Sequence, residues 1–191
     1  DGTNLHQITY HPHYDYVQTI LRDGRILMHS RQVYPEQAKI KTLAMRPNGT
    51  KAEIFYPGVD IVNRALRFCE TESGTIFFTE QDSMNLNKRN LVSIHQNRPL
   101  NSKVNYSENT EGNFFSVFPK SETSLIVAYQ PFGSQNIGLY NFSIDNKNIE
   151  ETLLTDSDYH YLDPVWVKPY QRPRNLPNEL KYNFPTGLIM C

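Results

Sequence analysis

Two short segments hold the residues best suited to chemistry, and the first is His11-Pro12-His13 with Asp15 two residues later. Histidines two apart on an extended segment point to the same side, which suits Zn²⁺ or Cu²⁺. A metal site needs three or four ligands, and this segment offers no obvious fourth. The segment is therefore either a polar loop between strands or part of a divalent metal site that joins His11 and His13 to His160.

The second segment, Asp158-Tyr-His160-Tyr-Leu-Asp163, precedes an apolar run just as His13-Tyr14-Asp15 precedes another. If the two runs are equivalent strands of a repeated unit, His13, Asp15, His160 and Asp163 converge at one mouth of the assembly. Imidazole and carboxylate groups that converge in a concave mouth suit a ligand or a metal. The alternative is that these residues cap turns by binding backbone amides.

Arginines supply a further set of candidate ligand-binding residues. Arg172 and Arg174 alternate with prolines, an arrangement able to clamp a carboxylate or a partner chain. Arg31, at the end of an apolar run, is the third candidate. The alternative is that these cations are solvated and keep the chain away from its neighbours.

Signatures of catalysis are missing from the sequence, which has no nucleophile elbow, P-loop, dinucleotide-binding or zinc-protease motif. His29 and Ser30 are adjacent in an apolar run, so on a strand they would point to opposite faces and could not act together. Cys69 and Cys191 belong to no CxxC motif and are either free thiols or a disulfide. The sequence favours a binding protein over an enzyme, with no cofactor beyond the divalent metal considered above.

Regularly spaced turns reveal the elements that must position these residues. Gly24, Gly74 and Ser124 each precede an apolar run and are spaced by 50 and 50 residues. Asp23-Gly24 between two apolar runs is also a strong hairpin signal. Four short strands in a repeat of this length are typical of a propeller blade. We therefore predict an all-β fold that forms a segment of a β-propeller.

Three complete blades of four antiparallel strands are predicted, over residues 16–60, 64–105 and 114–155. The predicted strands are 17–21, 25–31, 39–46 and 52–56; 64–68, 75–80, 90–96 and 102–106; and 114–118, 125–130, 137–144 and 150–154. Within residues 1–167, the edges of two more blades are predicted at 1–10, an outer strand, and 163–167, an inner strand. Residues 168–191 should be an extended segment rich in proline and arginine followed by a terminal strand. Almost no helix is expected, because no segment has an apolar period of 3.6 residues.

Composition limits the partners of such a protein. The chain has 19 Lys and Arg residues against 20 Asp and Glu, so no basic excess indicates nucleic-acid binding. No apolar run approaches the ~20 residues of a membrane-spanning helix. Three blades leave two blade faces open, whereas propellers typically have about 4–8 blades. We therefore expect a piece of a longer protein, whose ring is completed by other domains, a protein partner or a second copy of the chain.

Two stretches carry a family resemblance, Leu21-Arg-Asp-Gly-Arg-Ile-Leu-Met-His-Ser-Arg31 and Leu43-Ala-Met-Arg-Pro-Asn-Gly-Thr50. They resemble the blade pattern of TolB-like propellers. Together with Tyr170-Gln-Arg-Pro-Arg174, they are most similar to the N-terminal propeller of hydrazine synthase alpha-subunit-like bacterial proteins. The usual Asp-Pro at the head of an inner strand is present as Asp163-Pro164 but is replaced by Val17-Gln18 in the first blade.

The resemblance implies a binding or scaffold role in an exported bacterial protein, many of which are lipoproteins, with a periplasmic or extracellular location. Hydrazine synthase chemistry belongs to haems attached through CxxCH motifs in later domains, and this sequence contains no such motif. The predicted function is a non-catalytic module that contacts a protein partner or a ligand through loops at one propeller mouth. The alternative is an enzyme domain that binds a metal or a small molecule through its His and Asp residues.

Overall fold

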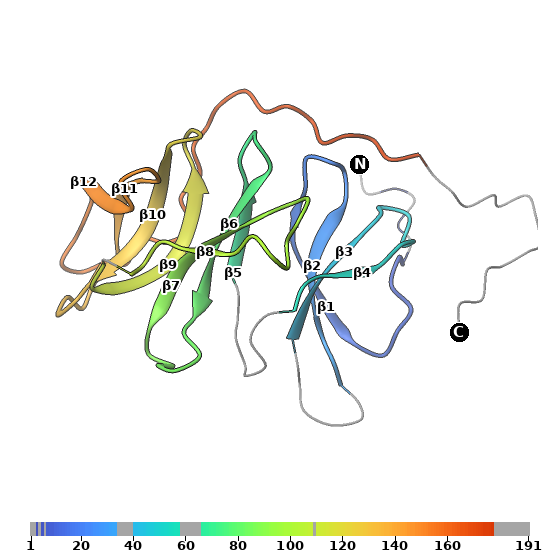
Figure 1. Cartoon of the computed structure of the whole chain (residues 1–191), viewed down its shortest axis with the longest axis horizontal. Helices are drawn as coiled ribbons and strands as arrows, with labels where there is room; N and C mark the ends of the chain where they lie inside the picture. Colours follow the sequence, from blue (N-terminus) through green and yellow to red (C-terminus); the bar gives the residue numbers. More distant parts are fainter. Residues whose placement is uncertain are drawn as a thin grey trace, which may run out of the picture.

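The computed structural model describes Thr3, Leu5 and residues 7–33, 40–57, 66–108 and 110–177. The strands of this part form three four-stranded antiparallel sheets, which follow one another along the chain as blades 1, 2 and 3 (Figure 1). Each sheet is a meander, because every strand pairs with the next strand of the sequence. The first strands of the three blades lie side by side, with β1 against β5 and β5 against β9.

The strands have the following bounds. Blade 1 contains β1 (Tyr14–Ile20), β2 (Ile26–Arg31), β3 (Ile40–Met45) and β4 (Glu53–Tyr56); blade 2 contains β5 (Leu66–Glu70), β6 (Thr75–Gln81), β7 (Arg89–His95) and β8 (Val104–Asn105); and blade 3 contains β9 (Gly112–Pro119), β10 (Ser124–Pro131), β11 (Gly138–Ser143) and β12 (Asn148–Leu154).

The predicted all-β fold with three complete four-stranded blades is confirmed, and the part of the chain described above contains no helix. It consequently contains no helix long and apolar enough to cross a membrane. The two predicted blade edges differ from the structure, because the described residues of 3–13 and 155–177 form no strand. Cys191, the predicted terminal strand and the first two residues of the predicted strand 64–68 lie outside the described residues.

Blade 2 is buried on both faces because its apolar residues continue through successive positions of one strand. Ile76 and Phe78 of β6 point toward blade 1, whereas Phe77 between them points toward blade 3. All three side chains are at most 1 % exposed. Successive side chains of a strand alternate between its faces, so an uninterrupted apolar run is what a sheet between two others requires.

Two apolar clusters fill the spaces between the blades, and each is rich in aromatic rings. The cluster between blades 1 and 2 contains Leu21, Leu27, Ala44, Phe55, Tyr56, Phe68, Ile76, Phe78, Val92 and Ile94. The cluster between blades 2 and 3 contains Phe77, Leu91, Tyr106, Phe114, Val117, Leu125, Val127, Tyr129 and Phe142. Burying one such side chain contributes roughly 1.5–3 kcal/mol, so these clusters hold the blades together.

A buried polar group also joins blade 1 to blade 2. The Tyr56 hydroxyl of blade 1 donates a hydrogen bond of 2.8 Å to the Glu80 carboxylate of blade 2, which also pairs with the Lys103 ammonium group. Glu80 is only 4 % exposed, so its charge requires both partners. Burial and the neighbouring Glu80 carboxylate raise the pKa of Tyr56, which therefore remains a hydrogen-bond donor.

Cys69, on β5 between blades 2 and 3, is a free thiol. Its sulfur lies 3.2 Å from the carbonyl oxygen of Val117 and 3.6 Å from that of Phe77. Burial raises the pKa of the thiol, which disfavours the reactive thiolate. Cys69 thus contributes to packing between the blades.

His29 on β2 is a buried histidine within the apolar space between blades 1 and 2. Its ring meets Phe68 edge to face at 5.5 Å, and its Nε2 atom has no hydrogen-bond partner. Burial lowers the pKa of His29 from 6.5 to about 4. The fold therefore accommodates the neutral imidazole and disfavours the protonated one.

This burial predicts a specific loss of stability in acid. As the pH falls below 6.5, His29 takes up a proton in the unfolded chain but not in the folded chain, so the free energy of unfolding decreases until the pH reaches about 4. The loss attributable to His29 should reach on the order of 3 kcal/mol. In urea unfolding between pH 7.5 and 4.5, His29→Leu should flatten the pH dependence and the control His95→Leu should not. Parallel curves for wild type and His29→Leu would contradict this prediction.

Candidate functional site

The turns that follow the first strands of the three blades gather at one end of the structure, which we call the inner-turn mouth. These turns cover residues 21–25, 71–75 and 120–124. In the first, the Gly24 amide donates to the Leu21 carbonyl oxygen at 2.9 Å. Gly24 and Gly74 have φ angles of +93° and +87°, a region that glycine adopts without steric cost. The regular spacing of turns in the sequence thus marks this mouth.

A segment without strands, residues 155–177, crosses the inner-turn mouth from blade 3 to blade 1, and we call it the strap. Figure 1 shows it as the orange and red trace that passes over the turn tips. The Asp163 amide donates to the Ser116 hydroxyl of β9 at 2.9 Å. At the other end, the Arg174 amide donates to the carbonyl oxygen of Arg22 at 2.8 Å. The strap is therefore fixed to both outer blades.

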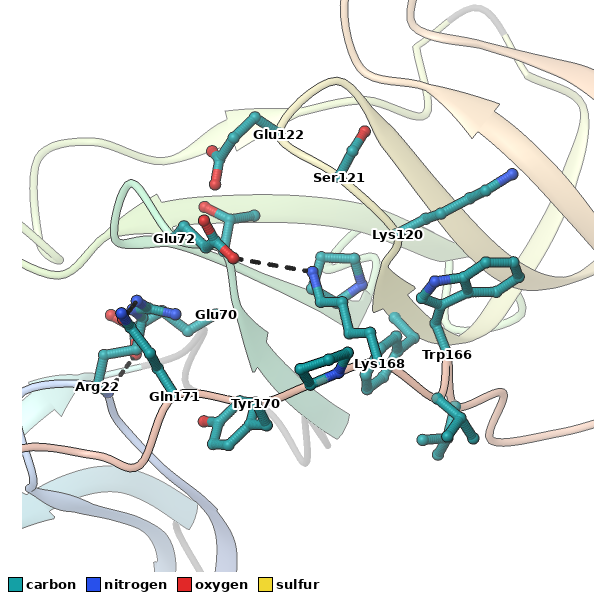
Figure 2. A pocket seen from close by; sticks show the side chains of 16 residues that line it. Arg22, Glu70, Glu72, Lys120, Ser121, Glu122, Trp166, Lys168, Tyr170 and Gln171 are labelled. Carbon is teal, nitrogen blue, oxygen red and sulfur yellow. Dashed lines mark hydrogen bonds and ion pairs between the residues drawn. The ribbon is translucent and has the colours of Figure 1, made fainter.

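A cavity of about 660 Å³ lies between the strap and the inner turns (Figure 2). Its walls come from all three blades and from the strap. The lining residues are Arg22, Glu70, Thr71, Glu72, Phe118, Pro119, Lys120, Ser121, Glu122 and residues 165–171. A volume of roughly 300–1,000 Å³ is typical of small-molecule sites.

The Glu70 and Glu122 carboxylates of the cavity accept hydrogen bonds from backbone amides. Glu70 Oε2 accepts from the Arg22 amide at 2.6 Å, and Glu122 Oε1 accepts from the Ser73 amide at 3.1 Å. Burial raises the pKa of Glu70 above its usual value despite this bond. Burial also raises the pKa of Glu122, but hydrogen bonds from Ser73, Thr71 and the Glu72 amide outweigh it and lower the pKa overall.

Three cationic side chains line the same cavity, and their polar contacts are weaker than those of its carboxylates. The Arg22 guanidinium group donates to the amide oxygen of Gln171 at 2.9 Å, and the Lys168 ammonium group lies 4.0 Å from the Glu72 carboxylate. The Lys120 ammonium group lies 5.2 Å from the centre of the Trp166 ring. In the described part of the chain, no carboxylate lies within ion-pair distance of Arg22 or Lys120.

A salt bridge holds the strap beside the inner strands. The Arg67 guanidinium group of β5 lies 2.6 Å from the Asp163 carboxylate of the strap. Both residues have positive φ, +62° for Arg67 and +54° for Asp163, a conformation that costs energy for residues other than glycine. Arg67 also sits in an irregularity of the pairing between β5 and β6. Both partners of this salt bridge therefore have a backbone conformation that is unusual for residues with a side chain.

The first predicted cluster, His11, His13 and Asp15, does form a group at the start of blade 1. His11 Nε2 lies 3.3 Å from an Asp15 carboxylate oxygen, and the rings of His11 and His13 are 4.9 Å apart. His13 Nδ1 and Asp15 Oδ1 are buried without hydrogen-bond partners. Even so, no three His, Cys, Asp or Glu side chains among the described residues are placed to hold a metal.

The structure does not bring the second predicted cluster to the first. His160 lies against blade 3, where its Nδ1 accepts the Ile137 amide at 3.2 Å, and Asp163 lies on the inner strands with Arg67 and Ser116. No described contact joins either residue to His13 or Asp15. The predicted arginines, Arg31, Arg172 and Arg174, are not brought together with these residues either.

Each predicted arginine has a different environment. Arg31 ends β2, where it is exposed and paired in register with Tyr14 and Ile40. Arg172 is exposed on the strap, and Arg174 approaches the first turn through its backbone. The side chains of Arg172 and Arg174 do not line the cavity described above.

Sequence reasoning missed the cavity residues, although a signal for three of them is present. Arg22 and Glu72 are 50 residues apart and occupy equivalent positions in the first two turns, and Glu122 is a charged residue within the third turn. A charged residue that recurs beside each repeated turn could have identified this mouth. The position of Trp166 had no comparable signal, because it depends on the path of the strap.

Comparison with known proteins supports the propeller-like fold. No protein-family model and no curated protein matches the sequence. The chain is similar in structure to Kuenenia stuttgartiensis hydrazine synthase, with a TM-score of 0.65 and 19 % sequence identity. The similarity covers 78 % of this chain and 21 % of the hydrazine synthase chain. At this identity the similarity shows the fold, here a segment of a β-propeller.

The anchoring of the strap gives a testable prediction. Ser116→Ala removes the acceptor of the Asp163 amide, and a lost hydrogen bond of about 1 kcal/mol should accelerate exchange of that amide by about fivefold. Hydrogen exchange followed by NMR measures this directly, with the amides of β10 as an internal reference. Ser157→Ala, at an exposed position of the same strap, is the matched control. Unchanged exchange of the Asp163 amide in Ser116→Ala would show that the hydroxyl does not anchor the strap.

Proposed function

We propose that the chain is a non-catalytic binding module of a larger propeller protein, and that it binds its ligand in the cavity beneath the strap. The supporting observation is the cavity itself, whose walls come from three blades and from a strap anchored at both ends. Ligand sites commonly lie where several elements converge and combine apolar walls with a few polar groups. Trp166 and Phe118 supply such apolar walls, and Arg22, Glu70 and Lys120 supply polar groups.

A binding role also fits the construction of the site. The side chains of the inner turns are held by hydrogen bonds within each turn, so the walls are in place before a ligand arrives. Thr71 and Ser73 bond to one another at 2.9 Å, and Asp23 accepts from the Arg25 amide at 2.9 Å. A site formed in advance loses less conformational entropy on binding. The similarity to hydrazine synthase contributes the fold to this proposal and no chemistry.

The proposal is testable because Trp166 is the single tryptophan of the sequence and lines the cavity. We expect at least one class among organic acids, amines, sugars and nucleotides to change Trp166 emission saturably. Ser121→Tyr, which places a larger side chain in the cavity wall, should abolish the change. Ser157→Tyr, on an exposed part of the strap outside the cavity, should preserve it. Binding that survives in Ser121→Tyr, or no saturable change with any class, would refute the proposal.

A second candidate function is binding of a metal or a small molecule at His11, His13 and Asp15 in an enzyme domain, although in this structure the three side chains are not placed as a three-ligand metal site. The observation that favours it is the pair of buried polar atoms without partners, His13 Nδ1 and Asp15 Oδ1. Buried groups of this kind normally have a partner, which a ligand could supply.

This second candidate predicts about one equivalent of bound Zn²⁺ in calorimetric titrations of protein purified without a metal-affinity step. His13→Ala should abolish that binding, because it removes the central imidazole of the group, whereas His95→Ala on blade 2 should bind as wild type does. Zn²⁺ binding that is absent from wild type, or equal in wild type and His13→Ala, would exclude a metal at this position.

A further inference from the structure

The polar groups of the cavity beneath the strap differ in how fully they are already engaged. Glu70 and Glu122 accept backbone hydrogen bonds, and Glu72 faces the Lys168 ammonium group. The carboxylate oxygens in these contacts thus serve the turns or the strap, and a cationic ligand would compete for them, whereas Glu70 Oε1 is buried without a hydrogen-bond partner. A carboxylate that gains hydrogen bonds from backbone amides is stabilised where it lies.

The cationic side chains of the cavity have more hydrogen-bond donors available for a ligand than the carboxylates have acceptors. Among the described residues, the Lys120 ammonium group contacts the Trp166 ring and has no hydrogen-bond acceptor, so its three donors are available. Lys168 lies 4.0 Å from Glu72, longer than a charge-assisted hydrogen bond of roughly 2.7–2.9 Å. Arg22 uses one Nη2 contact to the neutral amide of Gln171 and keeps its other donors. An anion entering the cavity would therefore gain contacts without displacing a carboxylate from a backbone donor.

Aromatic and apolar surface lies beside these cations. Trp166 is 44 % exposed and Tyr170 is 64 % exposed, and both belong to the cavity wall. Val165 and Phe118 extend the apolar part of the wall. Figure 2 shows the Lys120 chain beside the Trp166 ring and the Lys168 ammonium group directed toward Glu72, whereas Glu70 lies near Arg22. A flat apolar group can cover the rings while an attached anion meets the ammonium groups.

We infer that this cavity takes a carboxylate ligand with a flat apolar body, held by Lys120 and Lys168 and stacked on Trp166. The inference rests on the proposed function, since it names the ligand class of the same cavity. Lys120 belongs to blade 3 and Lys168 to the strap, so the ligand joins the strap to the blades. Binding therefore also fixes the strap in place.

The test compares three probes that share one ring and differ in charge, namely phenylacetate, benzylamine and benzyl alcohol. Isothermal titration calorimetry and Trp166 emission are measured for each. Phenylacetate should bind at least about tenfold more tightly than the other two, because only its carboxylate can accept charge-assisted hydrogen bonds from the ammonium groups. Lys120→Met and Lys168→Met should each weaken phenylacetate binding by about tenfold. Lys41→Met, at an exposed position on β3, should leave it unchanged.

The outcomes separate this inference from the proposed function. If benzylamine or benzyl alcohol binds at Trp166 as tightly as phenylacetate or more tightly, the cavity is a binding site but the carboxylate inference is wrong. If phenylacetate binds equally to wild type and to both lysine variants, the assigned contacts are wrong. If none of the three probes binds, the carboxylate inference fails, and the wider panel of ligand classes decides the proposed function. Thermal unfolding of each variant confirms that the lysine substitutions leave the fold intact.

Discussion

The structure depends on the burial of apolar faces between neighbouring blades. A single four-stranded sheet cannot cover its own two faces, so each blade is stable only against its neighbours. The middle blade shows the full requirement, because β6 sends Ile76 and Phe78 to one side and Phe77 to the other. Polar contacts between the blades add to this apolar packing. The Tyr56–Glu80–Lys103 group, for example, places a buried charge at the junction of blades 1 and 2 and satisfies it there.

Within the described structure, blades 1 and 3 each have a blade neighbour on one side, and the other face of blade 3 is covered in a different way. Ala128 lies in register with Ser116 and is fully buried, although it points away from blade 2. The strap passes on this side, where the Asp163 amide meets Ser116. The strap thus takes the place where the first strand of another blade would pack, without forming a strand. Its continuation over the turns then closes the cavity, so covering the blade and forming the site are two results of one chain path.

The sequence predicted the repeated elements well because their signals are local. The turn at Gly24 and the apolar run after it define a hairpin within a dozen residues, and the same pattern returns at Gly74 and Ser124. The path of the strap could not be read in this way. Its position depends on contacts between residues far apart in the sequence, such as Arg22 with Arg174, and on backbone conformations at Asp163 that no pattern announces. The cavity was missed for the same reason, since the strap supplies seven of its sixteen lining residues.

The course of the strap also sets the order in which the molecule can be assembled. Each blade consists of consecutive strands, so its sheet can form from neighbouring residues as soon as they have been synthesised. The cavity is different, because the contact that closes it joins Arg22 to Gln171, which are 149 residues apart. Nearly the whole described chain must leave the ribosome before that contact is available. The cavity is therefore the last part of the described structure to be completed, and a chain that ended before the strap would lack it.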